Sequence, residues 1–262
     1  MFKRKWPKPR CDESQLPHVL FILTPPYSGS TALAALLDSG PRTMILQERA
    51  EGQWLVPGLC DADRWDPGKS IDLTSIRRTW LARYQELRRD QPSIEVVIEK
   101  SPPNMMRFDA LARSFPDHSC LIFNRGPLAS CASVFHHHHR ARALTLQDRR
   151  DTFGMIAGKW VDRSRQLREL IDRRSLPFLN YERFCEDPSV LRSLLDLPDG
   201  VVESIDFGAT VAVKGGAARP IANRNAERLA DLDPEDLEHL AGCLAPHQAL
   251  LESFGYALPD PA

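Results

Sequence analysis

A glycine flanked by hydroxyl residues follows a short apolar run near the start of the chain, in VLFILTPPYSGSTALAALL from Val19 to Leu37. Gly29 lets the backbone approach a ligand closely, and Ser28, Ser30 and Thr31 add hydroxyl donors. The unpaired N–H groups and the dipole of a helix beginning here favour an anion. A well-capped helix without a ligand is the plainer alternative. The succession of strand, loop and helix favours the anion site.

The same loop contains no GKS or GKT. An ATP or GTP site of the ordinary kind needs that lysine and a Mg²⁺-holding serine or threonine. The sequence therefore disfavours a kinase or NTPase, and an atypical P-loop kinase stays open as the alternative.

A second candidate anion site begins at Arg125, which directly follows the apolar run SCLIFN. Ser133 comes eight residues later, on a helix expected to begin at Pro127. The helical spacing puts Ser130, Ser133, His137 and Arg140 on one face, which Arg125 could reach over. An ordinary solvated polar face is the alternative for the helix alone.

Short apolar segments alternate with helical patterns along the chain, which predicts an α/β fold with a mostly parallel sheet covered by helices on both faces, P-loop-like in three layers. Residues 50–72 are expected to be irregular. The expected strands are 18–24, 95–99, 119–124 and 177–181, with a short strand before Glu48. The expected helices are 31–37, 76–89, 105–115, 153–172 and 234–254, with others beginning at 127 and 187.

The chain has 262 residues, 42% of them hydrophobic, which suits one domain from 18 to 262 with a variable region at about 50–90. Residues 1–17 are expected to form a flexible arm, not a signal peptide. With 34 Lys+Arg against 35 Asp+Glu, no nucleic-acid partner is expected. The absence of a long apolar run argues against a membrane partner, and six scattered cysteines favour the cytoplasm. The oligomeric state is not decided, and a homodimer stays open.

Taken together, these motifs resemble the PAPS-dependent sulfotransferases, closest to their tyrosylprotein-type and bacterial branch. PYSGST (26–31) is similar to the P-[RK]-S-G-[ST]-[ST] loop that holds the 5′-phosphosulfate, and Arg125 with Ser133 to the pair that holds the 3′-phosphate. Tyr181 begins a segment similar to the family's YE-x-L…DP, whose tyrosine lies near the adenine. Tyr27 stands where the family has arginine or lysine, so another group must stabilise the leaving phosphate.

The resemblance also implies catalytic roles. Glu48 falls where the tyrosylprotein-type enzymes place their catalytic glutamate, and Lys100 aligns with a lysine that stabilises the bridging oxygen. A surface pair between Glu48 and Arg49 is the competing interpretation. The cytosolic branch uses a histidine after that lysine, and none occurs in Lys100–Pro103.

The remaining candidates are less specific. Lys214, Gly215 and Arg219 could close over the 3′-phosphate, and His137 could touch it. The run His136–His139 does not suit a metal, because consecutive helical residues point about 100° apart. Residues such as Trp54, Trp65 and Phe135 could line an aromatic mouth for the acceptor.

These features predict an enzyme that transfers the sulfuryl group of PAPS to a hydroxyl or amine of a small molecule, without a metal. Its product is adenosine 3′,5′-bisphosphate, and Glu48 acts as the base. A non-catalytic nucleotide-binding relative is the alternative that Tyr27 keeps open.

Overall fold

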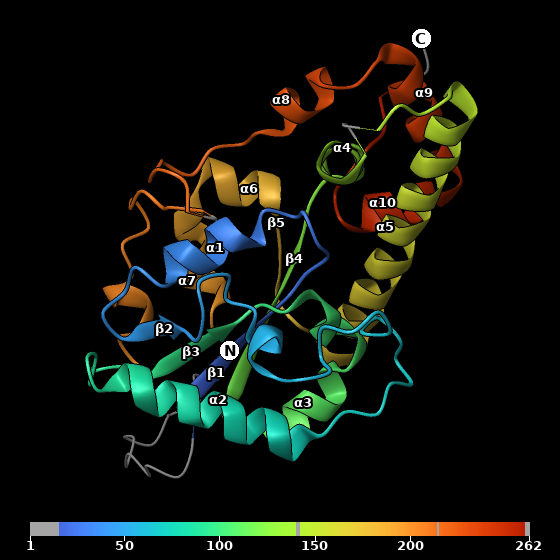
Figure 1. Ribbon diagram of the computed structural model, residues 1–262. Helices are drawn as coiled ribbons and strands as arrows, with labels where there is room; N and C mark the ends of the chain where they lie inside the picture. The colour runs from blue at the N-terminus through green and yellow to red at the C-terminus, as the bar shows by residue number, and fades with distance from the viewer. Residues whose placement is uncertain (1–15, 140–141, 214, 260–262) are drawn as a thin grey trace. The chain divides into compact units, whose positions relative to one another are not determined.

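The computed structural model describes residues 16–139, 142–213 and 215–259 (Figure 1). Residues 1–15 of the predicted N-terminal arm, and the predicted site residue Lys214, lie outside the described residues. The chain divides into two compact units. Among the described residues, the first comprises 16–23, 30–121, 188–213 and 215–221, and the second comprises 24–29, 122–139, 142–187 and 222–259. A single domain over 18–262 remains a prediction.

Five strands form one sheet in the order β2-β3-β1-β4-β5. The pairs β1–β3, β2–β3 and β4–β5 are parallel, as the alternation of apolar segments and helices predicts. Helices surround the sheet, and the predicted α/β fold is confirmed. The strand order reverses direction at β1 and β4, and ligands of such sheets bind beyond the carboxyl ends of the strands at this point.

The elements agree closely with the predicted segments, although several bounds differ. In the first unit they are β1 (His18–Leu23), α1 (Ser30–Leu37), β2 (Thr43–Ile45), α2 (Leu73–Arg88), β3 (Val96–Glu99), α3 (Phe108–Ser114) and α7 (Leu191–Leu194). In the second they are α4 (Pro127–His138), α5 (Leu146–Arg174), β5 (Phe178–Asn180), α6 (Tyr181–Glu186), α8 (Asn225–Ala230), α9 (Pro234–Leu244) and α10 (Gln248–Ser253). The units divide within β4 (His118–Asn124).

Aromatic side chains fill the core of the first unit. Phe21 of β1 packs edge-on against Phe108 and Phe115, with ring centroids 5.8 and 5.9 Å apart, and Trp80 of α2 stacks on Phe115 at 5.3 Å. Figure 1 shows α1 and α2 on opposite sides of β1–β3. Both faces of these strands are therefore covered, which explains why β1 is buried along its length and apolar from Val19 to Leu23.

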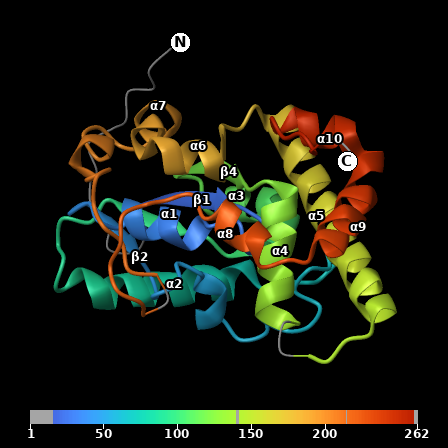
Figure 2. The ribbon, with the colours of Figure 1, turned by 90° about the horizontal axis from the view of Figure 1, so that it is seen from above.

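The long helix α5 organises the second unit, packing against α4, α9 and α10. Figure 2 shows α9 running alongside it. Phe153 of α5 stacks on Phe135 of α4 at 4.3 Å, and Arg149 forms ion pairs with Asp233 and Asp236 at the start of α9. These contacts hold α4 in place, and α4 carries Ser133 and the histidine run.

Three helices differ from their predicted bounds for local reasons. Helix α5 begins at Leu146, earlier than expected, because Thr145 and Asp148 form a capping box. The segment 102–114 splits into a 3₁₀ turn and α3 at Arg107. The closing helix is interrupted at Ala245–His247, where Pro246 lies in a 3₁₀ turn between α9 and α10.

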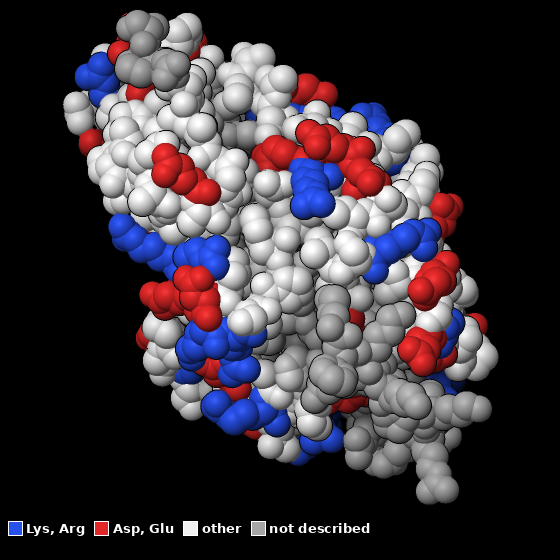
Figure 3. All heavy atoms as spheres, turned by 180° about the vertical axis from the view of Figure 1, so that it is seen from behind, with Lys and Arg blue, Asp and Glu red and all other residues white. Residues whose placement is uncertain are grey.

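Charged side chains form small mixed groups on the face drawn in Figure 3, where no continuous basic patch is visible among the described residues. This agrees with the balanced composition of the chain. None of the described helices combines the length and apolar character needed to span a bilayer.

Candidate active site

Arg125 follows β4 and is the centre of the site in the second unit. Its guanidinium donates from Nη1 to the carbonyl oxygen of Tyr27 at 3.2 Å and to Oγ of Ser133 at 3.1 Å. Its Nε donates to Oδ1 of Asn225 at 2.8 Å. The predicted pair of Arg125 and Ser133 therefore forms, and it lies against the loop that carries Tyr27, Ser28 and Gly29.

The guanidinium of Arg125 is buried and retains one unused donor. The residue is only 6% exposed, and its Nη2 makes no hydrogen bond within the described part of the chain. Burial lowers the pKa of Arg125 from its usual value, which shows the cost of placing this cation away from water. A buried arginine normally has its donors matched, so Nη2 marks a position suited to an anion oxygen.

Tyr181, the first residue of α6, connects the loop with Arg125. The guanidinium carbon lies 4.5 Å from the centre of its ring. The ring also lies so close to Gly29 that an added Cβ would be 2.5 Å from Cδ2 and Cε2 of Tyr181. Gly29 has a φ of 85°, so this position requires glycine both for its conformation and for the space.

The residues after Ile221 complete this cluster. The Tyr181 hydroxyl donates to the carbonyl of Ala222 at 3.1 Å and accepts from the amide of Arg224 at 3.1 Å. Glu182 accepts from the amide of Gly126 at 3.0 Å and from Nδ2 of Asn225 at 2.7 Å. Asn225 is thereby oriented with its Oδ1 toward Arg125.

Tyr27 adopts a left-handed backbone conformation, with a φ of 65°, which is unusual for a bulky residue. Its ring packs against His137 at 5.4 Å, and its hydroxyl lies 2.6 Å from Nε2 of His138. Burial lowers the pKa of His138, so the neutral imidazole is favoured. The predicted site residue His137 therefore contacts the loop through Tyr27.

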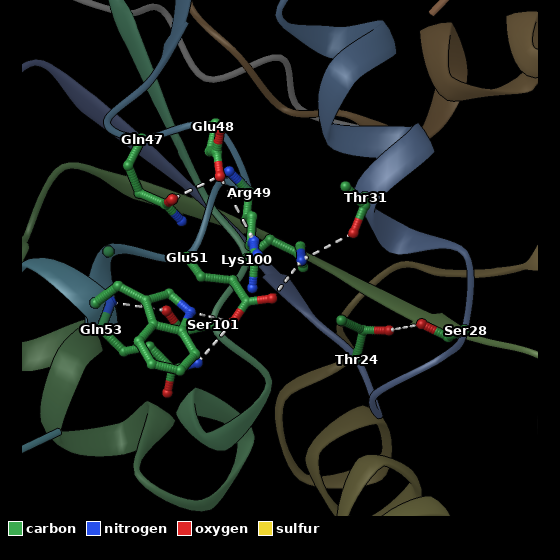
Figure 4. Close-up of polar contacts among 12 residues, drawn as sticks. Thr24, Ser28, Thr31, Gln47, Glu48, Arg49, Glu51, Gln53, Lys100 and Ser101 are labelled. Carbon is green, nitrogen blue, oxygen red and sulfur yellow. Dashed lines mark hydrogen bonds and ion pairs between the residues drawn. The ribbon is translucent and has the colours of Figure 1, made fainter. Parts of the chain in front are cut away.

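Lys100 follows β3 in the first unit and is 1% exposed. Its Nζ donates to Oε1 of Glu51 at 2.9 Å and to Oγ1 of Thr31 at 3.3 Å (Figure 4). Thr31 lies in the first turn of α1. The lysine predicted to be catalytic therefore contacts the first turn of α1, at the last residue of the SGST sequence.

Glu48, the predicted base, lies in the same unit with a side chain that is 83% exposed. Its Oε1 is 3.8 Å from Nε of Arg49, the surface pair that the sequence leaves open as an alternative (Figure 4). Glu48 as the base remains a prediction.

The other predicted residues have simpler surroundings. Ser28 is buried, donates to the carbonyl of Pro25 at 2.9 Å and contacts the hydroxyl of Thr24. Ser30 is buried as the first residue of α1. Gly215 has a φ of 73°, and Arg219 is exposed and pairs through its backbone with Val211. These last two belong to the first unit, and their roles remain predictions.

A model of the sulfotransferase family matches residues 17–197, well over half of the chain. The chain belongs to the sulfotransferase family. This sulfotransferase is similar in fold to a sulfotransferase from Alicyclobacillus acidocaldarius, with a TM-score of 0.58 and 15% identity over 93% of this chain and 98% of that one. It is also similar to sulfotransferase STF9 from Mycobacterium avium, with a TM-score of 0.52 and 13% identity over 92% of this chain and 78% of that one. No curated protein sequence gave a significant match.

Several site residues of this sulfotransferase were not predicted from its sequence. Glu51 contacts Lys100, and Asn225 accepts a hydrogen bond from Arg125. Glu182 accepts from Asn225, and His138 contacts the hydroxyl of Tyr27. Among the described residues, no group of three or more His, Cys, Asp or Glu side chains is placed to hold a metal ion. The histidine run instead contacts Tyr27 and, through His136, Asp231.

Proposed function

We propose that this sulfotransferase moves the sulfuryl group of PAPS to the hydroxyl or amine of a small-molecule acceptor in the cytoplasm. The observation that carries the proposal is the buried Arg125 guanidinium, which donates to Ser133 and to the Tyr27 carbonyl and whose Nη2 has no hydrogen-bond partner among the described residues. A 3′-phosphate supplies the oxygens that match such a donor. PAPS, which carries a 3′-phosphate, therefore fits the residues present around Arg125.

The 5′-phosphosulfate of PAPS is assigned to the loop that carries Ser28 to Thr31. The backbone amides of Ser28 to Thr31 and the hydroxyls of Ser30 and Thr31 lie at or just before the start of α1, an arrangement suited to a phosphosulfate. Gly29 permits close approach, because a side chain there would clash with Tyr181. Gly215 and Arg219, with Lys214, are proposed to close over the 3′-phosphate.

PAPS supplies a sulfuryl group on a good phosphate leaving group. The acceptor oxygen forms a bond to sulfur as the bond from sulfur to the bridging oxygen breaks, and that electron pair stays on the phosphate. Lys100 stabilises the charge that develops on the bridging oxygen. A carboxylate takes the acceptor proton, and Glu48 is the residue predicted from the sequence for this role.

Two measurements test the proposal. Adenosine 3′,5′-bisphosphate is expected to raise the thermal midpoint of the protein by several degrees, and ATP with Mg²⁺ is expected to raise it less. Labelled PAPS should then transfer its sulfur to acceptors, and Lys100→Ala should abolish the transfer while retaining bisphosphate binding. Stabilisation by ATP with Mg²⁺ alone would contradict the proposal and favour an atypical kinase. Bisphosphate binding with no turnover on any acceptor would favour a non-catalytic relative.

A further inference from the structure

Glu51 holds its carboxylate beside Lys100 through three hydrogen bonds. Oε1 accepts from Nζ of Lys100 at 2.9 Å, while Oε2 accepts from Nε2 of Gln53 at 2.7 Å and from Nε1 of Trp54 at 3.0 Å. The side chain is 17% exposed, so an acceptor can reach it. Each carboxylate oxygen can accept two hydrogen bonds, which leaves Oε1 able to accept one more.

The backbone on both sides of Glu51 is hydrogen-bonded to the end of β3, to Lys100 after it and to Trp80 of α2. The carbonyl of Ala50 accepts from the amide of Lys100 at 2.7 Å, and Ala50 has a left-handed φ of 54°. The amide of Gly52 donates to Oε2 of Glu99 at 2.8 Å, and its carbonyl accepts from Nε1 of Trp80 at 3.0 Å.

No side chain fits at Gly52, where an added Cβ would lie 2.5 Å from Oε2 of Glu99. Strained backbone that its surroundings hold in place is typical of functional sites. Glu51 is thus presented to Lys100 in a fixed position, as general base catalysis requires.

We infer that Glu51, rather than Glu48, takes the proton from the acceptor, and that Trp54 beside it binds an aromatic acceptor. The inference rests on the proposed sulfuryl transfer. Glu48 is 83% exposed and contacts Arg49, whereas Glu51 contacts the lysine assigned to the leaving oxygen (Figure 4). As the acceptor oxygen bonds to sulfur, its proton moves to Oε1 of Glu51, and the electron pair of the broken bond stays on the phosphate beside Lys100.

Trp54 defines the class of acceptor. At 57% exposure it is more exposed than any other large hydrophobic side chain in the described residues, yet its indole N–H holds the carboxylate of Glu51. A flat ring stacked on the indole would bring its hydroxyl to Glu51. Phenolic hydroxyls, with a pKa near 10, release a proton to a carboxylate more readily than aliphatic hydroxyls do. The acceptor is therefore an aryl hydroxyl compound.

The experiment compares the full-length wild-type protein with Glu51→Gln, Glu48→Gln and the matched surface variant Glu86→Gln on α2. Transfer from labelled PAPS is measured with 2-naphthol and with cyclohexanol, and bisphosphate affinity is measured by calorimetry. Glu51→Gln should lower kcat about 100-fold or more with bisphosphate affinity unchanged. The loss should exceed that in Glu48→Gln, and Glu86→Gln should keep the wild-type rate. Trp54→Ala should raise KM for 2-naphthol about tenfold, and Trp54→Phe should raise it less.

A wild-type kcat in Glu51→Gln, or a larger loss of kcat in Glu48→Gln than in Glu51→Gln, overturns the assignment of the base. If the wild-type protein still binds the bisphosphate, the proposed function is unaffected by either result. If Glu51→Gln shows no cooperative melting, Glu51→Asp decides, because it keeps the charge but draws the carboxylate back. In Glu51→Asp, a kcat reduced at least about tenfold supports the inference, and a wild-type kcat overturns it. Equal kcat/KM for naphthol and cyclohexanol overturns the acceptor class. Failure of the wild type to bind the bisphosphate overturns the proposed function itself.

Discussion

The hydroxyl of Tyr27 lies 2.6 Å from Nε2 of His138, and the carbonyl of the same tyrosine accepts a hydrogen bond from Arg125. One residue of the loop thus contacts an imidazole through its side chain and a buried guanidinium through its backbone. The family resemblance places a cation at this position. Tyr27 has a left-handed φ of 65°, a conformation that raises the free energy of the folded state for any residue other than glycine.

Replacing Tyr27 by arginine is expected to raise kcat for sulfuryl transfer about tenfold, because a cation beside the 5′ end stabilises the leaving phosphate. Arginine and tyrosine bear the same backbone cost, so the exchange tests charge. Tyr27→Phe is the control that removes the hydroxyl and adds no charge. Steady-state kinetics with labelled PAPS give the answer, and an unchanged or lower kcat in Tyr27→Arg would show that the site does not use a cation there.

Arg125→Lys is expected to weaken binding of adenosine 3′,5′-bisphosphate about 10- to 100-fold, which corresponds to about 1.4–2.8 kcal/mol. Lysine keeps the charge but lacks the planar fork that meets Tyr27, Ser133 and Asn225 together. Calorimetric titration measures the affinity. Arg165→Lys, on an exposed part of α5, serves as the matched control. Equal affinities in the two variants would remove Arg125 from the nucleotide site.

Gly29→Ala is expected to lower the free energy of unfolding by about 2–4 kcal/mol, because it combines a positive φ with a clash against Tyr181. Gly255→Ala isolates the first effect, since Gly255 has a φ of 77° and no atom within 4 Å of an added Cβ. That control should lose only about 1–2 kcal/mol. Urea denaturation measures the unfolding free energy of both variants. Equal decreases would show that the Tyr181 ring shifts to make room for the new methyl group.

Burial raises the pKa of Glu99 from 4.5 to about 7, against the opposing hydrogen bonds from Ser101 and Gly52; the charge of Glu51 raises it further. The folded protein therefore binds this proton more tightly than the unfolded chain does. The stabilising contribution is complete below about pH 4.5, decreases as the pH rises to about 7, and is constant above that. It amounts to roughly 3 kcal/mol.

Glu99→Gln should flatten the dependence of the unfolding free energy on pH over this window, measured by urea denaturation at a series of pH values. Asp38→Asn is the comparison, because burial raises the pKa of Asp38 from 3.8 to about 6, so its contribution to the unfolding free energy changes over a lower pH range. A slope unchanged by Glu99→Gln would show that Glu99 does not change its protonation on unfolding.

Much of the fold was predictable because it depends on local patterns. Short apolar runs such as His18–Leu23, between helical patterns, favour buried strands, and the SGST loop is a continuous segment. The pair of Arg125 and Ser133 was predictable for the same reason, since its spacing is that of a strand end and a helix. The SGST loop, Lys100 and this pair all follow strands, where parallel sheets bind their ligands.

The partners that orient these residues were not predictable, because they come from distant parts of the sequence. Glu51 meets Lys100 from a segment with no regular pattern, and only the folded contacts distinguish it from Glu48 three residues earlier. Asn225 reaches Arg125 from 100 residues away. Helix α8, which begins at Asn225, is only six residues long and gives no clear periodic signal.

The bond between Arg125 and Asn225 also has a consequence for biosynthesis. A growing polypeptide contains the loop, Arg125 and Tyr181 long before Asn225 has left the ribosome. The nucleotide cannot assist folding before the segment that carries Asn225 has been synthesised, because Asn225 orients the arginine through its Nε. The capacity to bind the donor is therefore gained later than the folding of the loop itself.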